Sequence, residues 1–139
     1  MNIRSFEPRD TEAIVELWRQ CNLLRPWNDP HKDIARKRAV RGDWFLVGEL
    51  DGRVVASAMV GYDGHRGWLY YLAVSPDLRN QGLGRAIVEH AEALLLAAGC
   101  PKINLQVRGS NTGVFEFYRV VGFSPDDVVS LGKRLIPDV

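Results

Sequence analysis

Hydrophobic residues in the middle of the chain follow two different patterns in succession. Over residues 68–74 nearly every position is apolar or aromatic, which predicts a strand buried on both faces. From Leu83 onward, apolar residues recur at helical spacing, and Gly99 and Pro101 mark the end of that helix. The apolar stripe of the helix consists of Leu83, Ile87, Val88, Ala91, Leu94 and Leu95. A short basic turn that contains glycine joins the strand to the helix.

The first part of the chain predicts a strand, two helices and a hairpin. Residues 3–6 are expected to form a short first strand, and Asp10 is placed to cap a helix whose apolar positions follow at three- and four-residue spacing. The two prolines within residues 25–30 predict a break before a second, basic helix over residues 32–41. The hairpin consists of strands over 44–50 and 54–60 around the turn Asp51-Gly52.

The last part of the chain predicts more strands. One covers residues 102–107, and the tail contains a strand near Phe123, a turn at Asp126-Asp127 and a final strand over 128–135. This order of elements predicts an α/β (α+β) fold with one central mixed, mostly antiparallel sheet flanked by about four helices. Residues 1–139 are expected to form a single domain.

The basic turn between strand and helix is the strongest candidate for a binding site. The first N–H groups of a helix have no partner within the helix, and the helix dipole favours anions there. Gly82 and Gly84 leave room for an anion to approach the backbone, while Arg79 and Arg85 add positive charge. Two glycines are too few for the dinucleotide fingerprint, and the Walker loop's Gly-Lys-Ser/Thr ending is absent. Without further evidence, a tight turn that needs glycine only for its shape explains the pattern equally well.

Composition limits the choice of function. The 139 residues carry a net charge of +1, which argues against nucleic-acid binding through bulk charge, and 46% of them are hydrophobic, which is sufficient for a core. Cys21 and Cys100 lie far apart and predict reduced thiols, with neither a disulfide framework nor a metal site. No signal segment and no membrane span is evident, so a cytoplasmic protein without a membrane partner is expected.

A second set of residues follows the 102–107 strand. This part of the chain resembles the GNAT superfamily of N-acetyltransferases in the order and spacing of its motifs and in the strands that flank them. The resemblance rests on Arg79-x-x-Gly82-x-Gly84 followed by Asn111, Tyr118 and Gly122-Phe123. The resemblance covers nearly the whole chain, and segments 23–30, 61–67, 99–103 and 130–135 match a small bacterial branch of the family. It implies a GNAT-like fold, acetyl-CoA as co-substrate and an amine acceptor, either a small molecule or a protein amine.

The resemblance also implies roles for single residues on the cofactor side. The turn would hold the pyrophosphate of acetyl-CoA, and the strand before it would pair with the pantetheine arm as if the arm were another strand. A bulge there would direct the N–H of Val74 at the thioester oxygen. Tyr118 would give a proton or hydrogen bond to the departing thiolate, unless it is only a core aromatic residue. The implied cofactor-binding residues are Leu72, Val74, Arg79, Asn80, Gln81, Gly82, Gly84, Arg85 and Asn111.

The acceptor side is less determined. Many GNAT enzymes carry a glutamate on the strand before the turn, but residues 68–71 contain no carboxylate. The general base is therefore sought among Asp29, Asp63, His65 and Tyr70, with a relay of ordered water as an equal alternative. Trp27, Trp44 and Tyr62 are either walls of an acceptor pocket or ordinary core. The carboxylates of Asp29 and Asp63 suit a cationic amine, whereas the basic residues 36–38 suit an acidic one or form a solvated face.

Three functions remain in competition. The first is transfer of an acetyl group from acetyl-CoA to a primary amine by direct attack in a ternary complex. The second is a regulatory module that binds acyl-CoA without transferring the acyl group, which the missing strand glutamate favours and Tyr118 disfavours. The third is an interaction subunit without a cofactor. A homodimer is compatible with each of them.

Overall fold

The computed structural model describes residues 1–138 and contains one five-stranded sheet with the order β1-β2-β3-β4-β5. The first three strand pairs are antiparallel, and only β4 and β5 run parallel. The strands are β1 (Asn2–Ser5), β2 (Phe45–Leu50), β3 (Arg53–Tyr62), β4 (Gly67–Val74) and β5 (Ile103–Asn104). The helices are α1 (Thr11–Gln20), α2 (Pro30–Ala39), α3 (Leu83–Ala97) and α4 (Thr112–Val120), and short 3-10 turns cover Pro8–Asp10, Gly42–Trp44 and Pro76–Leu78. The expected mixed sheet with four helices is confirmed.

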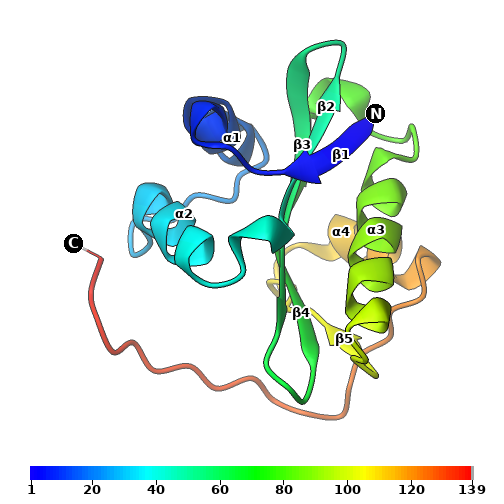
Figure 1. Cartoon of the computed structure of the whole chain (residues 1–139). Helices are drawn as coiled ribbons and strands as arrows, with labels where there is room; N and C mark the ends of the chain where they lie inside the picture. The colour runs from blue at the N-terminus through cyan, green and yellow to red at the C-terminus, as the bar shows by residue number, and fades with distance from the viewer. Residues whose placement is uncertain (139) are drawn as a thin grey trace.

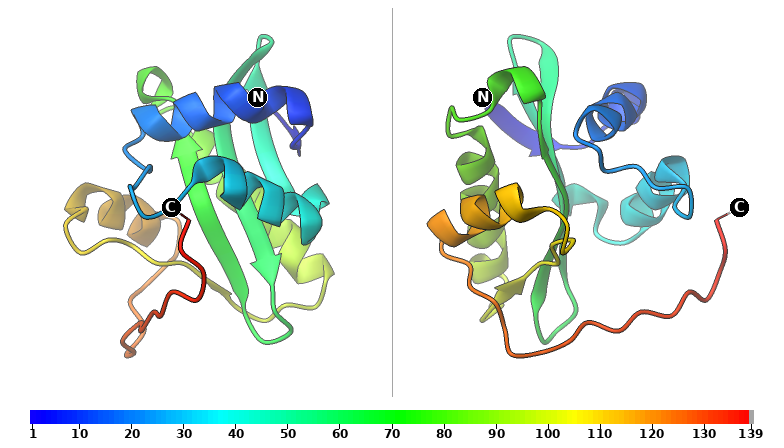
Figure 2. Two further views of the ribbon diagram at one scale, coloured as in Figure 1. Left: turned by 90° about the vertical axis from the view of Figure 1, so that its left-hand side faces the viewer. Right: turned by 180° about the vertical axis from the view of Figure 1, so that it is seen from behind.

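Helices lie on both faces of the sheet, so the core has two halves. Figures 1 and 2 show α1 and α2 on one face and α3 and α4 on the other. On the α3 face, Ile87 and Val88 of the predicted stripe are fully buried against the strands. On the α1 face, Trp18 packs beside Phe45, with ring centroids 6.2 Å apart. The apolar periodicity of both helices therefore identified their buried sides correctly.

The first hairpin confirms the turn chemistry read from the sequence. Asp51 and Gly52 connect β2 and β3 and have φ values of 52° and 75°. Two consecutive positive φ values are what a two-residue hairpin turn requires when it follows the right-handed twist of its strands. The tight turn sets the antiparallel start of the sheet.

The predicted burial of β4 on both faces is wrong. Leu69 and Ala73 are buried, but the side chain of Tyr70 is 48% exposed and Trp68 is half-buried. Helix α1 packs against β3 and β4 near Tyr71, whereas the hairpin end of β4 extends beyond the helices of that face (Figure 1). Aromatic residues in this half of the strand are therefore surface residues.

The predicted C-terminal strands are also wrong. Residues 121–138 contain no strand, and the strand expected over 102–107 is limited to Ile103–Asn104. Beyond Asn104 the chain leaves the sheet, so it offers no long edge with which a further strand could pair. The tail instead passes the β3–β4 hairpin as an extended segment and ends beside α2 (Figure 2). Its apolar side chains stay in contact with solvent, and Leu131 is 91% exposed.

The expected capping role of Asp10 is wrong as well. Asp10 occupies the N-cap position of α1, but its side chain makes no capping hydrogen bond. The carboxylate instead accepts from both guanidinium nitrogens of Arg4, at 2.8 and 2.9 Å, and from the N–H of Glu7 at 2.8 Å. An ion pair with β1 therefore takes the place of the cap, because the carboxylate is buried next to a strand that supplies a cation.

Three further observations concern the residues that the structure describes. None of the helices within 1–138 combines the length and the apolar character of a membrane span. The same residues contain no group of three or more His, Cys, Asp or Glu side chains that could hold a metal ion. Cys21 and Cys100 are both free thiols.

Candidate functional site

The sheet has an opening between β4 and β5. These parallel strands pair only at their beginnings, where Gly67 is opposite Ile103 and Trp68 is opposite Asn104. Strand β5 ends at Asn104, and Figure 1 shows the chain continuing from it as a loop toward α4. The edge of β4 from Leu69 to Val74 therefore has no strand partner among residues 1–138, and its backbone groups on that side are free to pair with a ligand.

A β-bulge lies on β4 beside this opening. Tyr70 pairs with Met59, and Ala73 pairs with Ser57. Tyr71 and Leu72 therefore lie together opposite the single β3 residue between Ser57 and Met59. Tyr71 has a φ of 52°, which is rare for a residue with a bulky side chain. The expected bulge is thus present, and it redirects the backbone of the strand where the edge is open.

Buried side chains hold the bulge from the α1 face. The Ser57 hydroxyl donates to the Tyr71 carbonyl at 2.8 Å and accepts from Nε1 of Trp18 at 2.9 Å. The Trp18 and Tyr71 rings stack with centroids 3.8 Å apart. Ser57 and Trp18 are fully buried. This network supports an unfavourable backbone angle with specific contacts, as is typical of functional sites.

The backbone at the end of β4 presents a donor to the opening. The N–H of Ser75 donates to the Val55 carbonyl at 2.8 Å and therefore faces β3. Because backbone groups alternate along a strand, the N–H group of Val74 is directed away from β3, toward the open edge. The carbonyl of Val74 accepts from the thiol of Cys21 at 3.3 Å, which ties the end of α1 to the same position.

The basic turn leads from this edge into the start of α3. Asn80 and Gly82 both have positive φ, at 64° and 81°. Ala86 is the first residue whose N–H bonds back into the helix, to the Gly82 carbonyl at 3.1 Å. The three N–H groups before it consequently lack helical partners, and those donors together with the helix dipole favour an anion. Arg79 and Arg85 are exposed on either side.

An ion pair fixes the beginning of the turn. Arg53 on β3 donates to both carboxylate oxygens of Asp77, at 2.8 and 2.9 Å, and to the Ser75 hydroxyl at 2.7 Å. The Ser75 hydroxyl also donates to the Asp77 carboxylate. The hydrogen bonds from Arg53 and Ser75 hold the pKa of the Asp77 carboxyl well below its usual range. The turn is therefore attached to the β2–β3 hairpin as well as to β4.

Glycine is needed at positions 82 and 84 of the turn for two different structural reasons. A Cβ on Gly82 would have no neighbour within 4 Å, so this residue is required for its φ of +81° and for open space above the helix start. A Cβ on Gly84 would lie 3.0 Å from Cζ of Phe117. Gly84 therefore permits close packing of α3 against α4. Sequence spacing could not separate these two reasons.

The second predicted set of residues lies on and around α4. Asn111 is the N-cap residue of α4, but its side chain makes no capping hydrogen bond. Tyr118 is half-buried, and its ring meets the edges of Phe117 and Phe123 at centroid distances of 5.2 and 5.7 Å. Burial raises the pKa of the Tyr118 phenol to about 12. The phenol therefore remains protonated at neutral pH. Gly122, with a φ of 103°, ends the helix.

The predicted acceptor residues near α2 have local roles. The Asp29 carboxylate caps α2 by accepting from the N–H groups of His31 at 2.9 Å and Lys32 at 3.3 Å. Trp27 is 49% exposed, and the Arg108 guanidinium lies 5.7 Å from the centre of its ring. This contact brings the α1–α2 connection next to the segment that follows β5.

The other predicted acceptor residues lie in the β3–β4 turn. The Asp63 carboxylate accepts from the N–H groups of Arg66 and His65, both at 2.8 Å, and these bonds lower its pKa. His65 itself is exposed. Figures 1 and 2 place this turn at the hairpin end of the sheet and the α1–α2 connection beside the helices. The expectation that the two loops face each other across one mouth is therefore wrong.

A group of charged residues near the bulge was missed in the sequence. The Tyr71 hydroxyl donates to Oδ2 of Asp33 on α2 at 2.6 Å, and Oδ1 of Asp33 accepts from Arg36 at 3.2 Å. Arg36 also donates to Asp138 of the tail at 2.6 Å. Asp33 is the one acidic residue within α2, and this isolation in a basic helix was the available signal. No sequence pattern indicated its contact with Tyr71 or Asp138, because both are far away in the chain.

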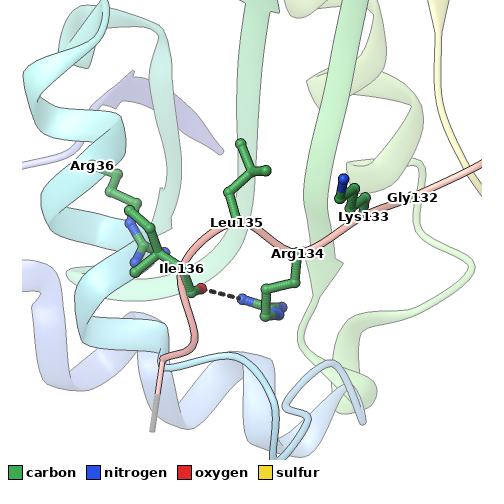
Figure 3. Close-up of a pocket in the computed structure, with 6 residues that line it drawn as sticks. All are labelled: Arg36, Gly132, Lys133, Arg134, Leu135 and Ile136. Carbon is green, nitrogen blue, oxygen red and sulfur yellow. Dashed lines mark hydrogen bonds between the residues drawn. The ribbon is translucent and has the colours of Figure 1, made fainter.

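The tail and α2 also enclose a hollow. It has a volume of about 570 Å³ and is open to solvent, and Figure 3 shows Arg36 and residues 132–136 around it. Arg134 donates to the Ile136 carbonyl at 3.3 Å, which closes a short loop of the tail. Arg134 also donates to the side chain of Asn28 at 2.6 Å. The tail is thus held against the end of the α1–α2 connection that leads into α2.

Comparison with protein families and curated proteins gives a consistent result. The model of the acetyltransferase (GNAT) family matches residues 11–123. The chain is 50% identical over 138 residues to an acetyltransferase of Pectobacterium atrosepticum, which covers 99% of this chain and 98% of the relative. An acetyltransferase of Sodalis glossinidius is 52% identical over 139 residues, again covering 99% and 98%.

Solved structures give the same picture at the level of the fold. The ribosomal-protein-S18-alanine N-acetyltransferase of Escherichia coli superimposes with a TM-score of 0.72 at 27% identity, over 88% of this chain and 77% of that one. Ard1 of Thermoplasma volcanium superimposes with a TM-score of 0.79 at 23% identity, over 88% and 82%. These likenesses show that the chain shares the fold of both proteins.

Proposed function

Because the chain belongs to the GNAT acetyltransferase family and is an N-acetyltransferase, we propose that it transfers the acetyl group of acetyl-CoA to a primary amine by direct attack in a ternary complex. One observation carries this proposal. The open edge of β4, with its bulge, leads directly into an anion-favouring helix start. An extended molecule with a polar arm and a pyrophosphate fits this arrangement, which combines strand-like pairing and an anion site.

The cofactor is held mostly by backbone groups. The pyrophosphate binds at the start of α3, with Arg79, Arg85 and the backbone of residues 80–84 around it. The pantetheine arm pairs with β4 at Leu72 and Val74, along the edge that has no strand partner. Asn111, whose amide makes no capping bond, supplies a hydrogen bond from the other side.

Two groups act on the reacting thioester. The Val74 N–H stabilises the oxyanion that forms when the amine attacks the carbonyl carbon, because a fixed donor in a shielded site needs no reorganisation. Tyr118 protonates the sulfur as the C–S bond breaks. Its pKa of about 12 keeps the phenol proton in place at neutral pH, and the developing thiolate is then the stronger base.

The acceptor enters from the face of the sheet on which α1 and α2 lie, because the side chain of the bulge residue Tyr71 packs on this face (Figure 2). Trp27 is exposed beside Arg108 and forms a wall of this entrance. Asp29, Asp63 and His65 remain candidates for recognition of the amine, although both carboxylates already bind backbone N–H groups. The identity of the amine is open between a small molecule and a protein amine.

A regulatory module that binds acyl-CoA without transfer is the second candidate. The observation that favours it is the composition of β4, in which residues 67–74 include no carboxylate that could act as a base. Both candidates predict binding of acetyl-CoA. Only the transferase predicts that CoA is released in an amine-dependent manner.

The experiment combines calorimetry with a thiol assay. Acetyl-CoA is titrated into the protein, and CoA release is then followed with lysine, spermidine, kanamycin and an alanine-initiated peptide as acceptors. Binding together with amine-dependent release supports the transferase. Binding without release from any acceptor favours the regulatory module. If acetyl-CoA does not bind and produces no thermal shift, both are wrong, because tight binding at a hundredfold excess over Kd stabilises a protein by about 3 kcal/mol.

A further inference from the structure

Asp33 and Tyr71 form a hydrogen-bonded pair at the bulge. Tyr71 is the bulge residue with positive φ, and its hydroxyl lies 2.6 Å from Oδ2 of Asp33. Its ring is fixed by the stack on Trp18, and its carbonyl by Ser57. The phenol therefore cannot move independently of the strand edge that faces the opening. Its hydroxyl lies toward α2, on the side from which an acceptor enters.

Charged groups from α2 and from two other segments surround the pair. Arg36, on α2 itself, donates to Asp33 at 3.2 Å. From the tail, the carboxylate of Asp138 faces the same guanidinium at 2.6 Å. The positive charge of Arg108, in the segment after β5, lowers the pKa of the Tyr71 phenol. Burial and the hydrogen bond to the Asp33 carboxylate have a larger, opposite effect and raise the pKa of Tyr71 well above its usual value. The phenol is thus neutral and donates its proton toward Asp33, and the second lone pair of its oxygen stays available.

We infer that Tyr71 and Asp33 are the proton acceptor for the attacking amine, a role that rests on the proposed transferase function. Tyr71 is the catalytic residue that touches the amine, and Asp33 acts through it. The pair supplies the carboxylate that β4 lacks, from the helix packed beside the strand. A proton acceptor must be within hydrogen-bond reach of the reacting group, and Tyr71 lies at the bulge of β4, where the thioester is proposed to bind.

The acceptor loses two protons in the reaction, because it arrives as an ammonium ion. It first gives one proton to the phenolic oxygen of Tyr71, and the phenolic proton passes to Oδ2 of Asp33 over the 2.6 Å contact. The neutral nitrogen then attacks the thioester carbonyl and forms the N–C bond while the C–S bond breaks, and the second proton of the nitrogen passes to water. The sulfur leaves as a thiolate and receives the proton of Tyr118. The products are the N-acetylated amine and CoA, and exchange with water then restores Asp33 and Tyr118.

The test compares pH profiles of Asp33→Asn, Tyr71→Phe and the wild type, with the amine of the panel above that the wild type uses best. Asn can still accept the Tyr71 hydrogen bond but cannot take its proton. We expect kcat/KM at pH 7 to fall about 10²-fold in either variant, as for other lost general bases. Near the pKa of the free amine the defect shrinks, because the acceptor then arrives already neutral.

Several controls separate this role from a structural one. Asp43→Asn, an exposed carboxyl outside the site, should leave the profile unchanged. The double variant should be no worse than either single one, because the two residues act as a unit. Acetyl-CoA affinity should stay within twofold in all variants. Tyr71→Phe keeps the ring that stacks on Trp18, so it tests the relay even if Asp33→Asn unfolds.

Each remaining outcome contradicts the inference. An equal loss at every pH would show that Asp33 only supports the fold of the site. An unchanged kcat/KM in Tyr71→Phe would remove Tyr71 from the reaction. If the wild type binds acetyl-CoA but acetylates no amine, the proposed transfer itself is wrong and the relay is wrong with it. If the wild type is active and the variants are too, only the relay is wrong.

Discussion

The two sides of the opening beside β4 are built in different ways. The proposed cofactor side consists of backbone: a strand edge, a bulge and the first N–H groups of α3, all within residues 69–86. The proposed acceptor side consists of side chains from distant segments, with Tyr71 on β4, Asp33 on α2 and Asp138 at the end of the tail. Backbone groups of one continuous segment can bind a ligand whatever the side chains are, so members of a family can share such a site. A site made of side chains from distant segments can differ between members.

The difference also appears in packing. Helix α3 presents fully buried residues to the sheet, and Gly84 allows α4 to approach it closely. The tail, in contrast, leaves its apolar side chains exposed and is held by a few polar contacts at its end. Perturbing the cofactor side should therefore affect binding and chemistry strongly, and perturbing the tail should affect them weakly.

The largest expected effect is at Gly82. Gly82→Asp places a negative charge at the start of α3, where the pyrophosphate is proposed to bind, and should abolish measurable binding of acetyl-CoA in calorimetry. Gly64→Asp is a matched control, because Gly64 also has positive φ, at 90°, and open space around its Cβ, but lies in the β3–β4 turn. Equal affinities in the two variants would refute the anion site, since both carry the same backbone strain.

This turn was predictable because its information is local. Glycine at 82, basic residues on both sides and a helix pattern after it are visible within a few residues, and the structure places all of them at the start of α3. The bulge was expected from the family resemblance only. Its position at Tyr71 depends on the register between β3 and β4 and on Ser57 and Trp18, which no pattern within β4 reveals.

The next effect concerns Tyr118. Tyr118→Phe keeps the ring between Phe117 and Phe123 but removes the phenol proton, so kcat should fall by about 10²-fold while acetyl-CoA affinity is retained. The pKa of about 12 adds a pH signature: wild-type activity should show no falling limb from this phenol below about pH 11. Tyr62→Phe, on β3, is the control for loss of a hydroxyl. A lower affinity with an unchanged kcat would assign Tyr118 to packing or binding.

A smaller effect is expected at Gly84. Alanine favours a helix over glycine by about 1 kcal/mol, but overpacking costs about 1–3 kcal/mol, and a Cβ 3.0 Å from Phe117 makes the second effect larger. If this strain makes the free energy of acetyl-CoA binding about 1 kcal/mol less favourable, Gly84→Ala weakens binding about fivefold. Adding Phe117→Leu should restore affinity. Gly113→Ala on α4, where a Cβ would meet nothing within 4 Å, should not weaken binding.

The tail shows where sequence reasoning failed and why. Residues 128–135 have the alternation and β-branched content of a strand, and the expectation of a strand there was reasonable. A strand also needs a neighbour, and β5 ends at Asn104. The tail is positioned instead by Asp138, a single carboxylate that meets Arg36 and the N–H of Asp29. Contacts of this kind join residues about a hundred positions apart and leave no periodic signal.

The smallest expected effect therefore lies at the end of the tail. Hydrogen bonds from Arg36 and the Asp29 N–H lower the pKa of the Asp138 carboxyl to about 2. A carboxyl whose pKa is lower in the folded protein stabilises the fold above its unfolded pKa of about 3.9, and this contribution is lost as the pH falls through the folded value. Asp138→Asn should thus lower the urea midpoint slightly at pH 5–7, and the difference from the wild type should vanish between pH 4 and 2. Trypsin should also cleave after Lys133 several-fold faster in this variant, whereas Asp127→Asn, an exposed carboxyl earlier in the tail, should change neither measurement. A midpoint difference that persists below pH 2 would mean that the carboxylate charge does not hold the tail, and that its anchorage depends on the shape of residue 138 alone.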